Sequence, residues 1–439
     1  MHNLALELAS KGHIVSGSDD QIFDPARTRL AAHGLLPEAM GWFPGKINKD
    51  IDLVILGMHA REDNPELLAA LQLDLKIQSF PEFMYEYAKG KKRVVIAGSH
   101  GKTTTTSMVM HILRSAGREF DYLVGAQLEG YQYMVGLTNA DIAVFEGDEY
   151  TSSPLDMRPK FLHYKPDITI ITGIAWDHIN VFETHEKYIH QFELLINEIE
   201  QNGILIYDHT DRELSSIVES SDVNAVAYSA FDYSKIGEDH FLNLNGTNHR
   251  VNFFGEHNFK NLKAAYLATK SLGISDDEFI TSLSTMPGPS RRLEKIYDAA
   301  NKAVFFDFAH APSKVKATVK AINESTEGRR SGILELHTFS SLNPIFIQEY
   351  AGSLEGLHDA AILYNPDTVL AKRMQLLDDE MIRSAFDYPE LTILHDQNEV
   401  NDYIHQLTDT NTLLLMSSGN FAGLDMRNVD WKSVFHSTK

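Results

Sequence analysis

The stretch VVIAGSHGKTTTTSMVMHIL, from Val94 to Leu113, decides the fold of this chain. Its apolar start predicts a buried strand, and the residues after Lys102 predict a helix. Glycines at positions 98 and 101 let backbone N–H groups turn inward around an anion, next to the positive end of that helix. Lys102 would then reach the β- and γ-phosphates of a nucleotide, and the Thr103 hydroxyl would bind Mg²⁺. The stretch therefore predicts a phosphate loop for ATP.

The loop is shorter than the general pattern G-x-x-x-x-G-K-[ST], because Ile96 stands where that pattern has its first glycine. The alternative is a strand-to-helix turn capped by glycine, with a lysine on the surface. Strand, loop, Lys-Thr pair and helix all occur in the order that a phosphate site needs, and this agreement favours phosphate binding.

Strand-like and helix-like segments alternate along the 439 residues, which predicts an α/β fold. The length suggests about three domains. We expect a partial Rossmann-like domain over residues 1–90, a central ATP-binding domain over 91–295 and a Rossmann-like C-terminal domain over 296–439. The polar KGKK segment marks the first boundary.

The beginning of the chain is unusual for such an arrangement. Leu4 and Leu8 share one face of a predicted helix, Gly12 ends it, and HIVSGSD (13–19) is predicted as a strand. A Rossmann-like domain normally starts with a strand and a glycine-rich turn. We therefore expect the first strand of the N-terminal domain to be missing. DLVILGMHA (52–60) is predicted as a later strand of that domain.

Charge and composition exclude several classes of protein. The net charge is −22, which disfavours binding to nucleic acid or to an anionic membrane surface. No cysteine is present, so thiol chemistry and disulfides are excluded. No apolar run is long enough for a transmembrane helix. The chain is therefore predicted to be cytoplasmic, with no indication of its oligomeric state.

Carboxylates and histidines follow two of the predicted strands. Glu146, Asp148 and Glu149 come after one strand, at the sheet edge where ligands bind, and carboxylates suit Mg²⁺. Asp177 and His178 end the next strand. Imidazole is not the usual Mg²⁺ ligand, so on chemistry alone His178 is equally well a structural histidine.

Three later segments carry further candidates. GEHNFKNLKAAYLA predicts a loop entering a helix, in which Asn258 is a possible cap and Asn261 faces an adenine or ribose. FFDFAHAPSK ends a strand with Asp307 and His310 before Pro312 opens a helix. RRLE places Arg292 at the boundary between the second and third domains.

Taken in order, GSHGKTTT, EGDEY, WDH, GEHNFKNLKAA, RRLE and DFAHAP resemble the motifs of the Mur ligase family, the ATP-dependent amide-forming enzymes of peptidoglycan synthesis. The resemblance implies catalytic roles for Lys102, Glu146, His178 and His310. It implies that Thr103 and Glu146 bind one Mg²⁺ and His178 a second. The residues that it implies around ATP are Gly98, Ser99, His100, Gly101, Lys102, Thr103, Thr104, His257, Asn258, Asn261, Arg292 and Asp307.

The segment DMRPKFLHY, of the form D-x-R-x-K-F-x-H-Y, is similar to the branch of the family that joins a murein tripeptide to UDP-N-acetylmuramate. The branch that adds L-alanine is the alternative, so the implied partners are UDP-N-acetylmuramate and a small peptide or amino acid. Gly173 replaces an asparagine common in the family, and ELHTFSSLN (335–343) lacks the arginines expected near the amino substrate.

The implied chemistry is activation of a carboxylate by phosphorylation, followed by attack of an amine on the acyl phosphate. His178, His310 and Asp307 are the candidates for the base. Two other functions stay open on the sequence: a non-catalytic nucleotide-binding protein, and a folate polyglutamate-forming ligase.

Overall fold

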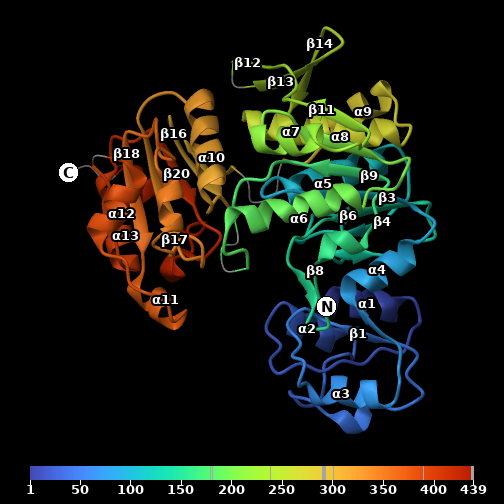
Figure 1. Ribbon diagram of the computed structural model, residues 1–439. Coiled ribbons are helices and arrows are strands. Elements are labelled where there is room, and N and C mark those ends of the chain that lie inside the picture. The colour runs from blue at the N-terminus through green and yellow to red at the C-terminus, as the bar shows by residue number, and fades with distance from the viewer. Residues whose placement is uncertain are drawn as a thin grey trace. The chain divides into compact units, whose positions relative to one another are not determined.

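The structure, a computed structural model, describes residues 1–177, 179, 181–237, 239–288, 293–299, 301–388 and 390–436 (Figure 1). The chain forms two compact units. Unit 1 comprises residues 1–174, 189–229 and 261–282, and unit 2 comprises residues 175–188, 230–260 and 283–439. Within the described residues, no helix combines the length and the apolar character needed to cross a bilayer.

The centre of unit 1 is a seven-stranded sheet in the order β11-β10-β9-β3-β6-β4-β5. All neighbouring pairs are parallel except β4 and β5. Its strands are β3 (Lys92–Ala97), β4 (Asp121–Leu123), β5 (Val135–Gly136), β6 (Ile142–Glu146), β9 (Ile168–Ile171), β10 (Ile204–Asp208) and β11 (Ala225–Tyr228). β3 is the central strand of this sheet. Five of its six residues are buried, as expected for a strand that is covered on both faces.

Helices and short elements connect these strands. The connecting helices are α5 (Lys102–Ser115), α6 (His185–Asn197) and α7 (Arg212–Glu219). Two further helices, α8 (Glu256–Ser271) and α9 (Asp276–Leu283), come later in the chain than β11, the last strand of this sheet. Between β6 and β9 the chain forms a small hairpin, β7 (Thr151–Ser153) and β8 (Asp156–Pro159), and then the 3-10 helix η2 (Lys160–His163). This connection carries residues from the carboxyl end of one parallel strand to the amino end of the next.

The first ninety residues contain α1 (His2–Ser10), α2 (Ala26–Ala32), η1 (Pro44–Lys46), α3 (Pro65–Gln72) and α4 (Phe80–Ala88), with a parallel pair of strands, β1 (Val54–Leu56) and β2 (Ile77–Ser79). The predicted strand over 13–19 is wrong: these residues form no strand, and Ile14 is fully exposed. A segment becomes a strand only by pairing with a neighbour, and β1 pairs with β2 alone. Gly12 does end α1 in the left-handed region, with φ of 88°.

Unit 2 is built on a six-stranded sheet in the order β15-β16-β20-β17-β18-β19, parallel except for β15 with β16. The strands are β15 (Glu294–Ala299), β16 (Lys302–Asp307), β17 (Arg330–Leu336), β18 (Asp359–Tyr364), β19 (Thr392–Leu394) and β20 (Thr412–Met416). A separate antiparallel sheet contains β12 (Tyr233–Ile236), β13 (Asp239–Leu244) and β14 (Thr247–Val251).

Helices cover both faces of the six-stranded sheet, so it carries two apolar cores. One core joins the sheet to α10 (Pro312–Ser325), η3 (Phe346–Tyr350) and α12 (Asp379–Phe386). The other joins it to α13 (Gln397–Gln406), η4 (Phe421–Gly423) and α14 (Trp431–His436). Along β17 the side chains alternate between the cores: Leu334 faces the core with α10, and Ile333 faces the core with α13. The short helix α11 (Pro366–Ala371) follows β18.

The α/β fold predicted from the sequence is confirmed. A parallel pair or sheet lies in each of the three predicted regions: β1 with β2, the sheet around β3, and the sheet around β17. The boundaries near 90 and 295 stay predictions.

Candidate active site

The loop between β3 and α5 has the backbone of a tight anion-binding turn. Gly98 and Gly101 have φ of 128° and 78°, values that side-chain-bearing residues rarely adopt. A Cβ on Gly98 would collide with the Thr172 side chain, and one on Gly101 would lie 2.5 Å from Oδ1 of Asn261. Both positions therefore need glycine, for conformation and for space.

The loop is fixed from one side by the residues that follow β9. The backbone N–H and the hydroxyl of Ser99 both donate to the carbonyl of Gly173, at 2.9 Å and 3.2 Å. The Thr172 hydroxyl donates to the carbonyl of His100. These bonds fix the loop at the N-terminus of α5. Thr104, another predicted residue, is buried in the first turn of that helix.

Lys102 begins α5, and its ammonium group is held inside the site. Its Nζ donates to the Gly98 carbonyl at 2.6 Å and to the Glu149 carboxylate at 3.0 Å. The Glu149 side chain is fully buried. Burial by itself would lower the pKa of Lys102, but Glu149, with Asp148 and Glu146, raises it above the ordinary value. The lysine is therefore charged and oriented before any phosphate arrives.

Thr103 and Glu146 lie side by side. The Thr103 hydroxyl donates to Oε1 of Glu146 at 2.9 Å, and the backbone N–H of Gly125 donates to Oε2 at 2.7 Å. Burial raises the pKa of Glu146, while Gly125, Lys102 and Thr103 act in the opposite direction. A hydroxyl and a carboxylate in contact are oxygen donors of the kind that Mg²⁺ takes, so these two residues fit the ion that the family implies.

Asp307 and His310 follow β16 in unit 2. The buried Asp307 carboxylate accepts the backbone N–H groups of Leu293 and Ala309, both at 2.7 Å, and the Thr318 hydroxyl at 3.2 Å. Nδ1 of His310 lies 2.9 Å from the carbonyl of Phe308. Through these hydrogen bonds, the Asp307 carboxylate stabilises the loop that follows β16.

Other candidate site residues lie in the segment before α6 and at the start of α8. Asp177 is buried and its Oδ2 accepts from Lys314 at 3.1 Å, within unit 2. Asn258 does not cap α8, which begins two residues earlier; its amide donates to the carbonyl of Phe254 at 2.8 Å. His257, half-buried, is near the position that a Cβ on Gly255 would take. Asn261 lies beside Gly101 in unit 1.

Two predicted residues, His178 and Arg292, lie outside the described residues. The structure also adds two groups to which the sequence assigned no role, the Gly125 N–H on Glu146 and Thr172 on the loop. It gives Glu149, which the sequence offered as a Mg²⁺ ligand, a different role as the partner of Lys102. Glu149 stood in the acidic motif, but only the folded chain shows which carboxylate faces the lysine.

The fold and this edge of the sheet first define the class of protein. It is an α/β protein with a glycine-rich strand-to-helix turn, a half-buried lysine and a hydroxyl–carboxylate pair. The comparisons with known proteins refine it. Residues 96–269 match the Mur ligase middle domain, and residues 1–92 match the Mur ligase family, catalytic domain.

Two curated relatives cover most of the chain. A UDP-N-acetylmuramate–L-alanine ligase of Caldicellulosiruptor bescii is 31% identical over 372 residues, which are 81% of this chain and 79% of the relative. The Haemophilus influenzae ligase of UDP-N-acetylmuramate and L-alanyl-γ-D-glutamyl-meso-2,6-diaminoheptandioate is 25% identical over 98% of this chain and 96% of its own.

Among solved structures, a murein peptide ligase from Psychrobacter arcticus superimposes with a TM-score of 0.63 at 24% identity, over 100% of this chain and 97% of its own. The chain belongs to the Mur ligase family. It is therefore a carbon–nitrogen ligase of the ADP-forming type, as the motifs predicted.

Proposed function

We propose that this chain joins the lactyl carboxylate of UDP-N-acetylmuramate to the amino group of a murein tripeptide, at the expense of ATP. The observation that carries the proposal is the pair of contacts at the end of β3, Lys102 with Glu149 and Thr103 with Glu146. They place a cation and an oxygen pair at the N-terminus of α5, as transfer of a γ-phosphoryl group requires.

The reaction has two steps. The carboxylate of the sugar attacks the γ-phosphorus, an O–P bond forms, and ADP leaves. The amine then attacks the acyl carbon, loses a proton, and expels phosphate as the amide forms. Lys102 would exchange its bond to Glu149 for one to the phosphate oxygens, which costs little reorganisation because the ammonium group is already positioned.

Thr103 and Glu146 would hold Mg²⁺, which when bound neutralises charge on the phosphates. The N–H groups of the loop bind the phosphate oxygens, and Ser99 and Thr172 keep the loop in the shape that presents them. His310 or the undescribed His178 would accept the proton of the amine. Asp307 is a weaker candidate because two backbone N–H groups and a hydroxyl already surround its carboxylate.

The choice of a tripeptide rests on the segment 156–164, which has the longer form typical of the tripeptide branch, and on the relative from Haemophilus influenzae, which matches along nearly the whole chain. The higher identity to an L-alanine ligase favours L-alanine as the second candidate. Both reactions use ATP and a UDP-sugar, and we propose a cytoplasmic location on that ground.

The test supplies ATP, Mg²⁺ and UDP-N-acetylmuramate, with either the tripeptide or L-alanine, and identifies the product by mass. We expect the UDP-muramyl tripeptide and release of phosphate that depends on both substrates. A product formed only with L-alanine would replace the first candidate by the second. ATP binding with no amide product from either amine would contradict the ligase and favour a non-catalytic nucleotide-binding protein.

A further inference from the structure

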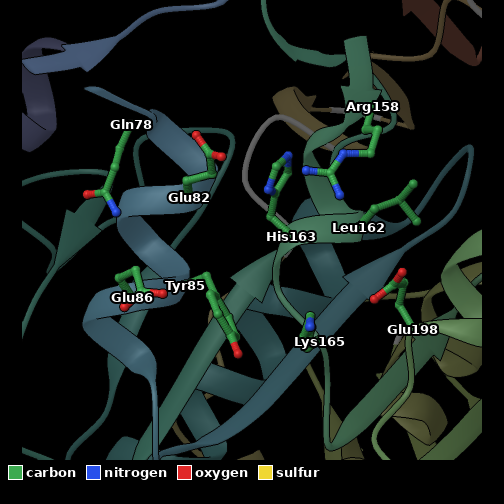
Figure 2. A pocket seen from close by; sticks show the side chains of 9 residues that line it. All are labelled: Gln78, Glu82, Tyr85, Glu86, Arg158, Leu162, His163, Lys165 and Glu198. Atoms are coloured by element: carbon green, nitrogen blue, oxygen red, sulfur yellow. The ribbon is translucent and has the colours of Figure 1, made fainter. Parts of the chain in front are cut away.

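A second cluster of ligand-type side chains lies in unit 1, among residues that the proposed reaction does not use. Glu82 in α4, Asp156 in β8 and His163 at the end of η2 each offer one atom, and these three atoms lie within 4.8 Å of one another. Two of them, Glu82 and His163, also line a cavity of about 340 Å³ (Figure 2). Lys165 and Glu198, which also line it, precede β9 and β10 in the chain, so the cavity lies toward the amino ends of parallel strands.

The histidine of this cluster is buried and unsatisfied. The His163 side chain is 5% exposed, and Nε2 meets no hydrogen-bond partner among the described residues. Asp156 Oδ2 lies 3.3 Å from this nitrogen, but not in the alignment of a hydrogen bond. A buried polar atom without a partner costs about 1–3 kcal/mol, so a ligand that pairs with this nitrogen would stabilise the fold.

The two carboxylates are held in place by the protein. One oxygen of Glu82 accepts the N–H of Ser79 at 2.6 Å in the capping box of α4. Its other oxygen has no hydrogen bond to the described residues. Arg158 donates to both oxygens of Asp156, at 3.0 Å and 2.6 Å. Figure 2 shows the imidazole between the Glu82 carboxylate and the Arg158 guanidinium.

The local charge favours a cation. The cavity is lined by three glutamates, Glu82, Glu86 and Glu198, against the two cations Arg158 and Lys165, and Asp156 adds a fourth carboxylate. Burial, followed by the charge of Arg158, lowers the pKa of His163. A neutral imidazole offers the lone pair of one ring nitrogen to a metal ion.

We propose that Glu82, Asp156 and His163 bind a divalent transition-metal ion, for which Zn²⁺ is the best match. An imidazole with two carboxylates suits zinc, whereas Mg²⁺ prefers oxygen ligands alone. Zinc commonly takes three protein ligands and a water, and the adjoining cavity admits that water. Zinc–ligand bonds of about 2.0–2.2 Å require side-chain rotations that bring these atoms, now within 4.8 Å of one another, onto the ion.

Such an ion would act as a structural tie. Glu82 lies in α4, the helix before β3, whereas Asp156 and His163 belong to the connection from β6 to β9. The site would thus clamp α4 to the segment that begins at the acidic motif of the phosphate site. It is independent of the choice of amino substrate.

The test is a calorimetric titration of the full chain with Zn²⁺, in buffer containing excess Mg²⁺, and a parallel titration with Co²⁺ followed by visible absorption. We compare wild type with His163→Gln and with Glu82→Gln, which keeps the capping box because glutamine also accepts there. The controls are Glu86→Gln, from the same cavity, and His13→Gln, an exposed histidine.

We expect one Zn²⁺ per chain in wild type and in both controls, with a rise in the midpoint of thermal unfolding. His163→Gln and Glu82→Gln should each weaken that binding by about tenfold or more and remove the cobalt absorption bands. Equal zinc binding by wild type and the two site variants would overturn the proposal, as would displacement of Zn²⁺ by Mg²⁺ at similar concentration. If His163→Gln fails to fold, Glu82→Gln decides the outcome.

Discussion

One segment of the chain, residues 146–164, supplies two sites of opposite character. At its start, the buried Glu149 meets the half-buried Lys102, and the half-buried Glu146 meets Thr103, so that charges and hydrogen bonds are matched. At its end, His163 presents a buried nitrogen with no hydrogen-bond partner among the described residues. The first site lies at the carboxyl ends of the parallel strands, and the second toward their amino ends.

The two sites differ in whether the protein itself supplies a partner for each polar group. At the turn between β3 and α5, Glu149 is the counter-charge of Lys102, and in the proposed reaction a phosphate takes its place as the partner of the lysine. At the cavity beside α4, Nε2 of His163 has no hydrogen-bond partner among the described residues. A ligand that binds this nitrogen would therefore stabilise the fold. Four changes break or sharpen this contrast, from the largest expected effect to the smallest.

Lys102→Ala removes the side-chain cation whose Nζ lies 3.0 Å from the Glu149 carboxylate. Charge on the transferring phosphoryl group then lacks its main side-chain partner, and we expect turnover to fall by about 1,000-fold or more. Phosphate release with saturating substrates measures this. Lys92→Ala, on the exposed start of β3, is the control and should keep full activity. Retained turnover in Lys102→Ala would exclude the role of the loop lysine.

Gly101→Ala tests the shape of the loop. The new Cβ would lie 2.5 Å from Oδ1 of Asn261 at a φ of 78°, so we expect ATP binding to weaken by about 10- to 100-fold. Gly117→Ala is the matched control: its φ is 69°, but no atom lies within 4 Å of the added Cβ. Isothermal titration with ATP compares them. Equal losses in both variants would mean that backbone strain, and not crowding in the site, causes the effect.

Glu149→Gln breaks the match between the buried lysine and its counter-charge. We expect a loss of about 1–3 kcal/mol in the stability of the nucleotide-free protein, because a buried ammonium loses a charged partner. ATP should restore part of the loss by supplying phosphate oxygens. Thermal unfolding with and without ATP measures both. A variant that is as stable as wild type without ATP would show that Lys102 does not depend on Glu149.

The smallest effect concerns His163 and pH. Burial first, and then Arg158, lowers the pKa of His163 in the folded protein. In the unfolded chain the ring takes up a proton near pH 6.5. This contribution to stability is complete above that pH and is lost as pH falls from there toward the folded-state pKa. In metal-free buffer with a chelator, we expect wild type to lose up to about 1 kcal/mol more than His163→Gln between pH 7.5 and pH 5.5.

Unfolding midpoints at the two pH values check this, with His13→Gln as the control. A wild type and a His163→Gln variant with parallel pH dependence would contradict the buried, neutral state of His163.

The sequence by itself determined the turn from β3 into α5, because a strand, two glycines, Lys102, Thr103 and a helix are neighbours in the chain and their geometry is local. That this turn binds the phosphates of ATP stays a prediction. It also determined the alternation of strands and helices, and hence the α/β class. It was wrong about the strand at 13–19, because a strand exists only with a partner that local sequence does not reveal.

Only the tertiary structure decided which carboxylate faces Lys102. The acidic motif offers Glu146, Asp148 and Glu149, and the path of the backbone after β6 turns Glu149 to the lysine and Glu146 to Thr103. It also brought Glu82 to within reach of His163 across about eighty residues of sequence. Contacts of this kind depend on how parallel strands and their connections pack, because separation along the chain carries no information about distance in the fold.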